Sequence, residues 1–326
     1  MEAPRVYLSR NIPTAVEILE ESCDLTIHKK TKPPSKRELM GNVRDKHALL
    51  CIPYDRIDRT VIASAPDLRV ISTYSVGYDH IDVEFAAERG IQVGHTPDVL
   101  TEATADLAFT LMVAAARRIA EADRLVRAKK WKSLWSYDFM LGSDLQGKTL
   151  GIIGMGRIGS ALARRSRGFR MRILYHNRKR LPADTERELG VEYSGLRELL
   201  QESDFVSIHV PLSNDTRNLI NEQNLKLMKP NAYLINTSRG QVIDERALVK
   251  ALRKRWIAGA ALDVFEKEPL PRDSSLLKFD NVVLAPHIGS ATWETRQRMA
   301  EVAALNILNV LKGGKPLYAV NPAAIK

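Results

Sequence analysis

A glycine-rich stretch in the middle of the chain constrains its fold more than any other feature. The apolar run Leu150–Ile153 leads directly into Gly154-Met-Gly156-Arg-Ile-Gly159, and good helix formers follow from Ser160. A dinucleotide site needs this order of strand, tight turn and helix N-terminus. The first glycine allows the turn, the second lets the backbone approach a pyrophosphate, and the third lets helix and strand pack closely. The sequence therefore predicts a βα unit that binds a dinucleotide.

The bulk properties of the chain indicate a soluble protein of two domains. It has 326 residues, of which 44% are hydrophobic and 27% charged. We find no secretory leader at the N-terminus and no apolar run near the ~18 residues of a membrane span. Cys23 and Cys51 lie far apart, which favours buried reduced thiols and a cytoplasmic location. Without such an apolar run we expect no membrane partner. Cys51, His95 and His209 form no metal-binding pattern, so we expect no metal.

The net charge of +10 raises the alternative of a nucleic-acid partner. The basic residues are scattered, however, with only short clusters at Lys29–Lys36 and Arg164–Arg172, and no aromatic residues interleave with them. We therefore expect no nucleic acid. Solvated basic faces that attract anionic substrates and cofactors are the milder interpretation.

Strand and helix patterns alternate along the chain, which predicts parallel sheets with right-handed crossovers, an α/β fold. A first series has expected strands at Arg5–Ser9, Leu25–Lys29, Ala48–Pro53, Arg69–Tyr74 and Ile91–Gly94. A second has them at Leu150–Ile153, Met171–Tyr175, Phe205–Val210, Ala232–Asn236, Gly259–Val264 and Val282–Ala285. Between the two series, residues 103–116 are apolar almost all round and predict a buried helix. The pattern turns amphipathic and basic beyond Arg117, and a long helix here would connect two domains.

Three segments at the ends of strands in the second series carry a cation, a carboxylate and an imidazole. They contain Arg239, Glu268 and His287, and open α/β sheets bind their ligands at this edge. A guanidinium can bind a carboxylate with two parallel hydrogen bonds. An imidazolium can protonate a carbonyl oxygen while hydride reaches the carbon, and a neighbouring carboxylate orients the imidazole and favours its charged form. The combination predicts hydride transfer to a 2-keto acid.

With these segments the chain resembles the D-isomer-specific 2-hydroxyacid dehydrogenase family over nearly its whole length. Within that family it is most similar to the archaeal-type glyoxylate reductases. The matching stretches are 75–82, 96–109, 154–159, 202–205, 209–212, 235–240, 262–270 and 285–290. The resemblance implies two doubly wound parallel-sheet domains. A Rossmann coenzyme domain (102–290) would be inserted into a flavodoxin-like substrate domain (1–101 plus 291–326), with the active site in the cleft and a homodimer through the coenzyme domain.

The same resemblance implies roles for individual residues. Arg239 would bind the substrate carboxylate, His287 would donate the proton, and Glu268 would be its partner. The backbone of Val76 and Gly77 would also hold the carboxylate. The residues expected to line the cofactor are Gly154, Met155, Gly156, Arg157, Ile158, Gly159, Val210, Pro211, Thr237, Ser238, Arg239, Asp263, His287, Ile288 and Gly289, with Asp263 near the nicotinamide.

The choice of cofactor can be argued from the residues after the second strand of the coenzyme domain. An NAD site usually carries Asp or Glu roughly 20 residues after the glycines, bound to the ribose hydroxyls. Here the strand is followed by His176, Asn177, Arg178, Lys179 and Arg180, without a carboxylate. We expect NADP to be preferred, bound through Asn177, Arg178 and Lys179, with NAD possible. The alternative is a basic surface loop.

Bulky side chains offer weaker hypotheses about the substrate. Tyr54 is a candidate for the substrate pocket, and Trp131 and Trp135 are candidates for a partner subunit's site, with core or dimer packing as an equal alternative. The sequence thus predicts an NADPH-preferring reductase of glyoxylate and hydroxypyruvate. A D-lactate-type or broad 2-ketoacid reductase is the main alternative, and a phosphoglycerate dehydrogenase is disfavoured. A nucleotide-sensing corepressor-like binding protein is the alternative from another class.

Overall fold

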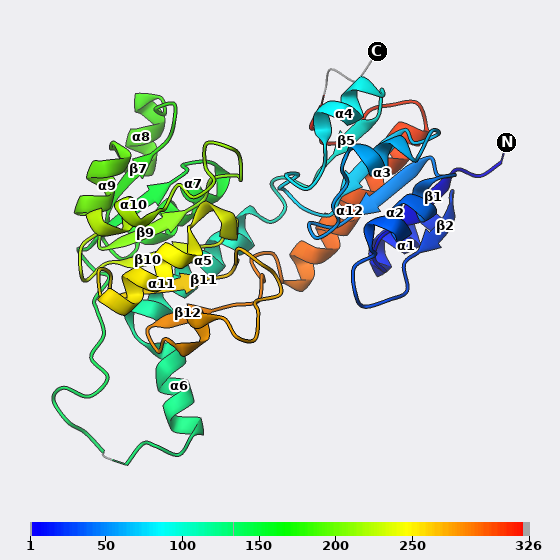
Figure 1. Ribbon diagram of the computed structural model, residues 1–326. Helices are drawn as coiled ribbons and strands as arrows, with labels where there is room; N and C mark the ends of the chain where they lie inside the picture. The colour runs from blue at the N-terminus through cyan, green and yellow to red at the C-terminus, as the bar shows by residue number, and fades with distance from the viewer. Residues whose placement is uncertain (1, 133, 322–326) are drawn as a thin grey trace. The chain divides into compact units, whose positions relative to one another are not determined.

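The computed structural model describes residues 2–132 and 134–321, and its chain forms two compact units. The terminal unit comprises the residues up to Leu100 together with those from Ser290 onward. The central unit comprises Thr101–Gly289. Each has its own parallel sheet, and each is described below by itself (Figure 1).

A five-stranded parallel sheet forms the middle of the terminal unit, in the order β2-β1-β3-β4-β5. This is the flavodoxin-like order. The strands are β1 (Arg5–Leu8), β2 (Asp24–Ile27), β3 (Ala48–Cys51), β4 (Val70–Thr73) and β5 (Gln92–Gly94). The helices are α1 (Pro13–Glu20), α2 (Lys36–Val43), α3 (Arg59–Ala63), α4 (Val83–Glu88) and α12 (Trp293–Leu311).

The two faces of this sheet are covered by different helices, because successive residues of a strand point to opposite faces. Ile71 belongs to a core that also contains Leu39 of α2, Val61 of α3 and Ala86 of α4. The next residue, Ser72, donates a hydrogen bond to the Ala303 carbonyl of α12, which packs on β3 and β4. Ser35 begins α2 with a capping box to Glu38, and the Asp58 side chain caps α3.

The central unit has a seven-stranded parallel sheet in the order β12-β11-β10-β9-β6-β7-β8. Its two halves wind outward from β6 and β9, as in a Rossmann fold. The strands are β6 (Thr149–Ile153), β7 (Arg172–His176), β8 (Glu192–Tyr193), β9 (Phe205–Ile208), β10 (Tyr233–Asn236), β11 (Gly259–Leu262) and β12 (Val282–Leu284). The expected pair of doubly wound parallel-sheet α/β domains is therefore confirmed.

Helices cover both faces of the seven-stranded sheet. One core contains Ile152 and the buried side chains of α5 (Thr101–Ala116) and α7 (Arg157–Arg167). The other contains Ile153 and the apolar sides of three further helices. These are α9 (Leu196–Glu202), α10 (Glu222–Leu227) and α11 (Glu245–Lys254), while α8 (Ala183–Leu189) lies between β7 and β8 in the chain. Both faces of the inner strands β6, β9, β10 and β11 are thus buried, which explains their continuous apolar runs.

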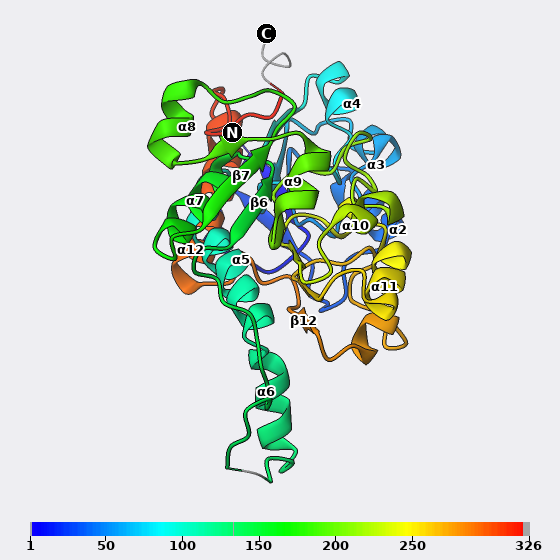
Figure 2. The ribbon, with the colours of Figure 1, turned by 90° about the vertical axis from the view of Figure 1, so that its left-hand side faces the viewer.

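The expected long helix from residue 101 is interrupted. α5 ends at Ala116, Arg118 has a left-handed backbone with φ 53°, and a separate helix α6 (Ile119–Arg127) follows. α6 buries no side chain and projects away from the seven-stranded sheet (Figures 1 and 2). Both helices belong to the central unit, so the prediction of one helix that connects two domains was wrong. Within the described part of the chain, no helix is long and apolar enough to cross a membrane.

Candidate active site

The glycine-rich loop begins where β6 ends, at the point where the strand order of the central sheet reverses. Gly154 has φ +99°, and a Cβ there would lie 2.7 Å from the backbone of His209, which follows β9. A Cβ on Gly159 would collide with the Gly154 carbonyl oxygen. The first and third glycines therefore meet the two requirements argued from the sequence, a turn that L side chains rarely adopt and close helix packing.

The start of α7 has the features of an anion-binding site. Gly156 is its N-cap and supplies no side chain to cap it, and a Cβ at Gly156 would meet nothing within 4 Å. The first amide N–H groups of a helix lack intrahelical partners, and the helix dipole favours negative charge at this end. Arg157 and Ile158 form the first turn, and Met155 is buried beneath the loop. This arrangement fits the pyrophosphate of a dinucleotide.

The loop after β7 carries the residues predicted to select the cofactor, and their side chains have different contacts. The Asn177 side chain accepts a hydrogen bond from the Met155 amide at 2.7 Å, so it braces the glycine loop. Arg180 pairs with Glu186 at 2.8 Å, while Arg178 lies 3.4 Å from Asp215 and both of these side chains are exposed. Lys179 has no ion pair within the described ranges. Arg178 and Lys179 are thus the two cations of this loop without a short ion pair to a buried carboxylate.

The loops after β9 and β10 complete the same edge of the sheet. Val210 and Pro211 follow β9 and are partly or fully exposed. Asn236, at the end of β10, binds the backbone of Ser238 and Arg239 through its buried amide group. The Thr237 hydroxyl is buried and has no hydrogen-bond partner among the residues that the structure describes. A buried hydroxyl of this kind is a hydrogen-bonding group for a ligand.

The imidazole and the carboxylate predicted from the sequence are in contact. His287 Nδ1 lies 2.7 Å from Glu268 Oε2, and the other oxygen of Glu268 accepts a hydrogen bond from the Phe265 amide at 3.0 Å. Because a carboxylate accepts, His287 Nδ1 carries the hydrogen and donates it. The side chains of His287 and Glu268 are only 27% and 15% exposed. The pair fixes the imidazole ring and leaves Nε2 as its second functional nitrogen.

Asp263 explains how the His287 loop is held. Its buried carboxylate accepts hydrogen bonds from the amides of Ile288 at 2.7 Å and Gly289 at 2.8 Å. Its backbone carbonyl accepts from the His287 amide at 2.8 Å. Burial raises the pKa of Asp263, although these two side-chain hydrogen bonds act in the opposite direction. The side chain is thus engaged inside the protein, and its proximity to a nicotinamide stays a prediction.

Arg239, Glu268, His287 and the glycine loop all belong to the central unit, at the carboxyl ends of its strands. The remaining predicted residues, Tyr54, Val76 and Gly77, belong to the terminal unit. Tyr54 is half-exposed on the loop after β3, and Val76 and Gly77 lie on the loop after β4.

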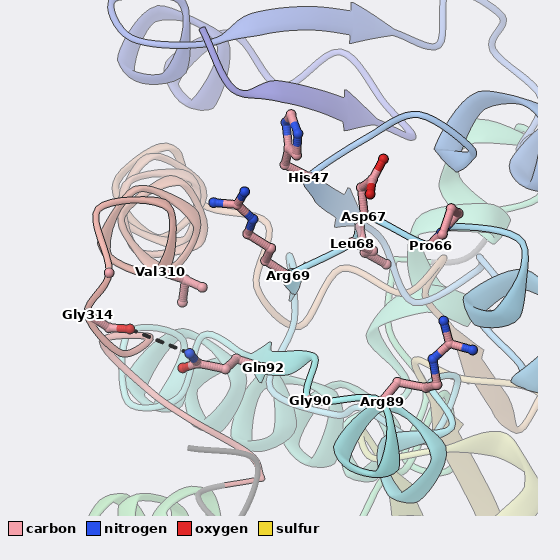
Figure 3. A pocket seen from close by; sticks show the side chains of 11 residues that line it. His47, Pro66, Asp67, Leu68, Arg69, Arg89, Gly90, Gln92, Val310 and Gly314 are labelled. Carbon is pink, nitrogen blue, oxygen red and sulfur yellow. Dashed lines mark hydrogen bonds between the residues drawn. The ribbon is translucent and has the colours of Figure 1, made fainter. Parts of the chain in front are cut away.

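A cavity of about 540 Å³ in the terminal unit lies at the other edge of its sheet (Figure 3). His47 and Arg69 directly precede β3 and β4, and Gln92 begins β5, so these three lining residues mark the amino ends of the strands. Open α/β sheets bind their ligands at the carboxyl ends. The cavity is therefore separate from the loops predicted to bind substrate.

Known proteins resemble the chain over its full length. Residues 109–289 match the family described as D-isomer specific 2-hydroxyacid dehydrogenase, NAD binding domain. The chain belongs to this family. It is thus a nicotinamide-dependent dehydrogenase of 2-hydroxy acids, as the resemblance implied.

Three relatives illustrate the match to the dehydrogenase. A glyoxylate reductase of Thermofilum pendens is 54% identical, over 100% of this chain and 97% of the relative. The TT0316 protein of Thermus thermophilus is 46% identical, with a TM-score of 0.90 over 97% of this chain and 99% of that one. An NADPH-dependent glyoxylate/hydroxypyruvate reductase from Sinorhizobium meliloti, in complex with NADP and malonate, is 33% identical. Its TM-score is 0.88, over 99% of this chain and 98% of that one.

Proposed function

We propose that this dehydrogenase is an NADPH-preferring reductase of small 2-keto acids, which converts glyoxylate to glycolate and hydroxypyruvate to D-glycerate. The observation that carries the proposal is the hydrogen-bonded pair of Glu268 and His287, at the same edge of one sheet as the glycine loop. The names of the Thermofilum and Sinorhizobium relatives support the choice of substrates and of NADPH.

The chemistry divides between a cofactor and the protein. When bound, the reduced nicotinamide supplies the hydride that adds to the keto carbon. Arg239 binds the substrate carboxylate with its planar guanidinium, and the backbone amides of Val76 and Gly77 bind it as well. His287 Nε2 gives its proton to the keto oxygen, and Glu268 orients the ring by accepting the hydrogen bond from Nδ1. One hydride and one proton are thus added across the carbonyl group.

The cofactor would be held by groups on the loops at the carboxyl ends of the central strands. The amides at the start of α7 suit the pyrophosphate, and Thr237 offers its buried hydroxyl. Arg178 and Lys179 suit a 2′-phosphate, and their charge supports NADPH over NADH. Val210, Pro211, Ser238, Ile288 and Gly289, on neighbouring loops, would line the rest of this site, together with Asp263.

The substrate should be recognised mainly by what surrounds its third carbon, since every 2-keto acid has the carboxylate and the keto group. Glyoxylate has a hydrogen atom in place of the third carbon. Tyr54, Trp131 and Trp135 are the bulky candidates for the pocket around this position. We expect kcat/KM for glyoxylate and hydroxypyruvate to exceed that for pyruvate and branched keto acids at least about tenfold, which corresponds to ~1.4 kcal/mol. Assays of each acid with NADPH and with NADH test this.

The possible results of those assays separate the candidate functions. A preference for pyruvate or a branched acid would indicate the D-lactate-type or broader reductase and reject glyoxylate as the substrate. Absence of turnover with every keto acid, together with retained NADPH binding, would instead indicate a corepressor-like binding protein.

We propose that the enzyme is a homodimer, and the segment after α6 supports this. Leu134 and Tyr137 are 95% and 83% exposed, and a second copy would remove such apolar surface from water. α5 packs largely within its own unit against α7, β10 and β11. The location in the cytoplasm stays a prediction.

We expect sedimentation at micromolar concentration to give a species of twice the 36.6 kDa chain mass. Leu134→Glu should produce the monomer, because a charge in an apolar interface loses its hydration. Leu317→Glu is the matched control, since Leu317 is an exposed leucine of the terminal unit. A wild-type chain that sediments only as a monomer would contradict the proposal.

A further inference from the structure

The loop after β4 has three consecutive carbonyl groups that each accept a hydrogen bond from the protein. The Ser75 carbonyl accepts from the Thr96 amide at 2.9 Å. The Val76 carbonyl lies 2.9 Å from His95 Nδ1, and the Gly77 carbonyl accepts from the Ser75 hydroxyl at 2.6 Å. The carbonyls of this loop are therefore fixed in direction by the terminal unit itself.

The hydroxyl of Ser75 begins a chain of hydrogen bonds whose directions can be assigned. Because its hydrogen is given to the Gly77 carbonyl, Ser75 Oγ must accept from Thr73 Oγ1, which lies 2.7 Å away. Thr73 Oγ1 has then used its only hydrogen, so it accepts from His80 Nε2 at 3.0 Å. His80 must carry a hydrogen on Nε2, and His95 must carry one on Nδ1, since a carbonyl only accepts.

Two backbone amides of the same loop have no hydrogen-bond acceptor among the described residues. Val76 N and Gly77 N donate to none of the residues that the structure describes. In a trans peptide the C=O and N–H groups point in opposite directions, and the only cis peptide within the described ranges is Glu268–Pro269. The Ser75 carbonyl shares its peptide with the Val76 amide, and the Val76 carbonyl shares its peptide with the Gly77 amide. Because the two carbonyls point toward their donors, these two amides point the opposite way.

We propose that His95 is a positioning residue that holds the Gly77 amide in the direction needed to bind the substrate carboxylate, and that Thr73, Ser75 and His80 support it by fixing the peptide on the other side of Gly77. This inference rests on the proposed function, which assigns the carboxylate to these two amides. Loss of the His95 donor frees the Val76 carbonyl to rotate, and the Gly77 amide of the same peptide rotates with it. The Ser75 hydroxyl holds the Gly77 carbonyl, which shares its peptide with the Tyr78 amide, so its loss frees the chain on the other side of Gly77. The substrate then loses preorganised hydrogen bonds, while the coenzyme loop in the central unit is unchanged.

The test uses pairs of variants in the full-length enzyme. Thr73→Val removes the hydroxyl with little change in shape, and Thr73→Ser keeps it. We expect His95→Phe to raise the KM for glyoxylate and the inhibition constant of oxalate about tenfold, as expected for lost hydrogen bonds to a charged group. Thr73→Val should raise both in the same direction. kcat and the dissociation constant of NADPH should stay near their wild-type values, and Thr73→Ser should behave as the wild type.

Ser72→Ala is the matched control within β4, because Ser72 donates to α12 and lies outside the hydrogen-bond chain. His95→Phe removes the second donor from a partly exposed position, and it tests the proposal even if Thr73→Val does not fold. The proposal is overturned if folded His95→Phe keeps the wild-type KM and oxalate inhibition, or if Ser72→Ala changes them equally. A wild-type enzyme without keto-acid turnover contradicts the proposed function instead, and oxalate binding then still reports on these residues.

Discussion

Replacing His287 with alanine is expected to lower kcat by about 10²–10⁴, the range for loss of a general acid. His287 is held by Glu268 through Nδ1, so its ring is oriented before substrate arrives. The variant removes the proposed proton donor and leaves the glycine loop intact. Steady-state kinetics with glyoxylate and NADPH measure the loss, and fluorescence titration should show little change in NADPH affinity.

His47→Asn is a suitable control for this loss, because His47 lies at the amino ends of the strands in the terminal unit (Figure 3). Its Nδ1 accepts a hydrogen bond from the Arg5 amide at 2.9 Å, so its role there is local. The control should keep wild-type kcat. Near-normal turnover by His287→Ala would remove His287 from the mechanism.

The combined change of Asn177→Asp and Arg178→Ala is expected to lower the preference for NADPH over NADH by at least about tenfold. The new carboxylate repels a 2′-phosphate, and the lost guanidinium no longer pairs with it. Aspartate can keep the hydrogen bond from the Met155 amide, because that bond is accepted by the side-chain oxygen. The glycine loop should therefore keep its shape, and the ratio of kcat/KM for the two cofactors isolates the electrostatic effect.

Arg187→Ala controls for the general loss of positive charge. Arg187 is an exposed arginine of α8 that pairs with Asp184 on the same helix. Its removal should leave the cofactor preference unchanged. A tenfold wild-type preference for NADH would show that Arg178 and Lys179 form only a solvated surface.

The parts of the site that could be predicted are set by short sequence segments. A glycine that needs a positive φ and a glycine that needs close packing are both visible in one six-residue motif, at Gly154 and Gly159. Arg239, Glu268 and His287 each follow a buried strand, and parallel strands bring their carboxyl ends to one edge. The contact between Glu268 and His287 is the outcome of that rule.

The parts that were missed depend on contacts between distant segments. Nothing local marks Asp263 as the residue that holds the Ile288 and Gly289 amides, since 25 residues separate Asp263 from Ile288. His95 meets the Val76 loop because β4 and β5 pair in parallel with Ser72 opposite Gly94. That register could have been inferred once both strands were predicted. The break at Arg118 coincides with the change to an amphipathic pattern beyond Arg117, but that change does not mark a left-handed residue.

The location of Arg239, Glu268, His287 and the glycine loop within a single unit has a kinetic consequence. Their mutual distances do not depend on any rearrangement of the terminal unit, so the intrinsic deuterium isotope effect on hydride transfer should be a property of the central unit. If the Val76 and Gly77 amides bind the substrate carboxylate as proposed, changes in the terminal unit should act on how firmly the keto acid is captured before transfer. A weaker capture lets the substrate dissociate more often, and the observed isotope effect on kcat/KM then rises toward its intrinsic limit.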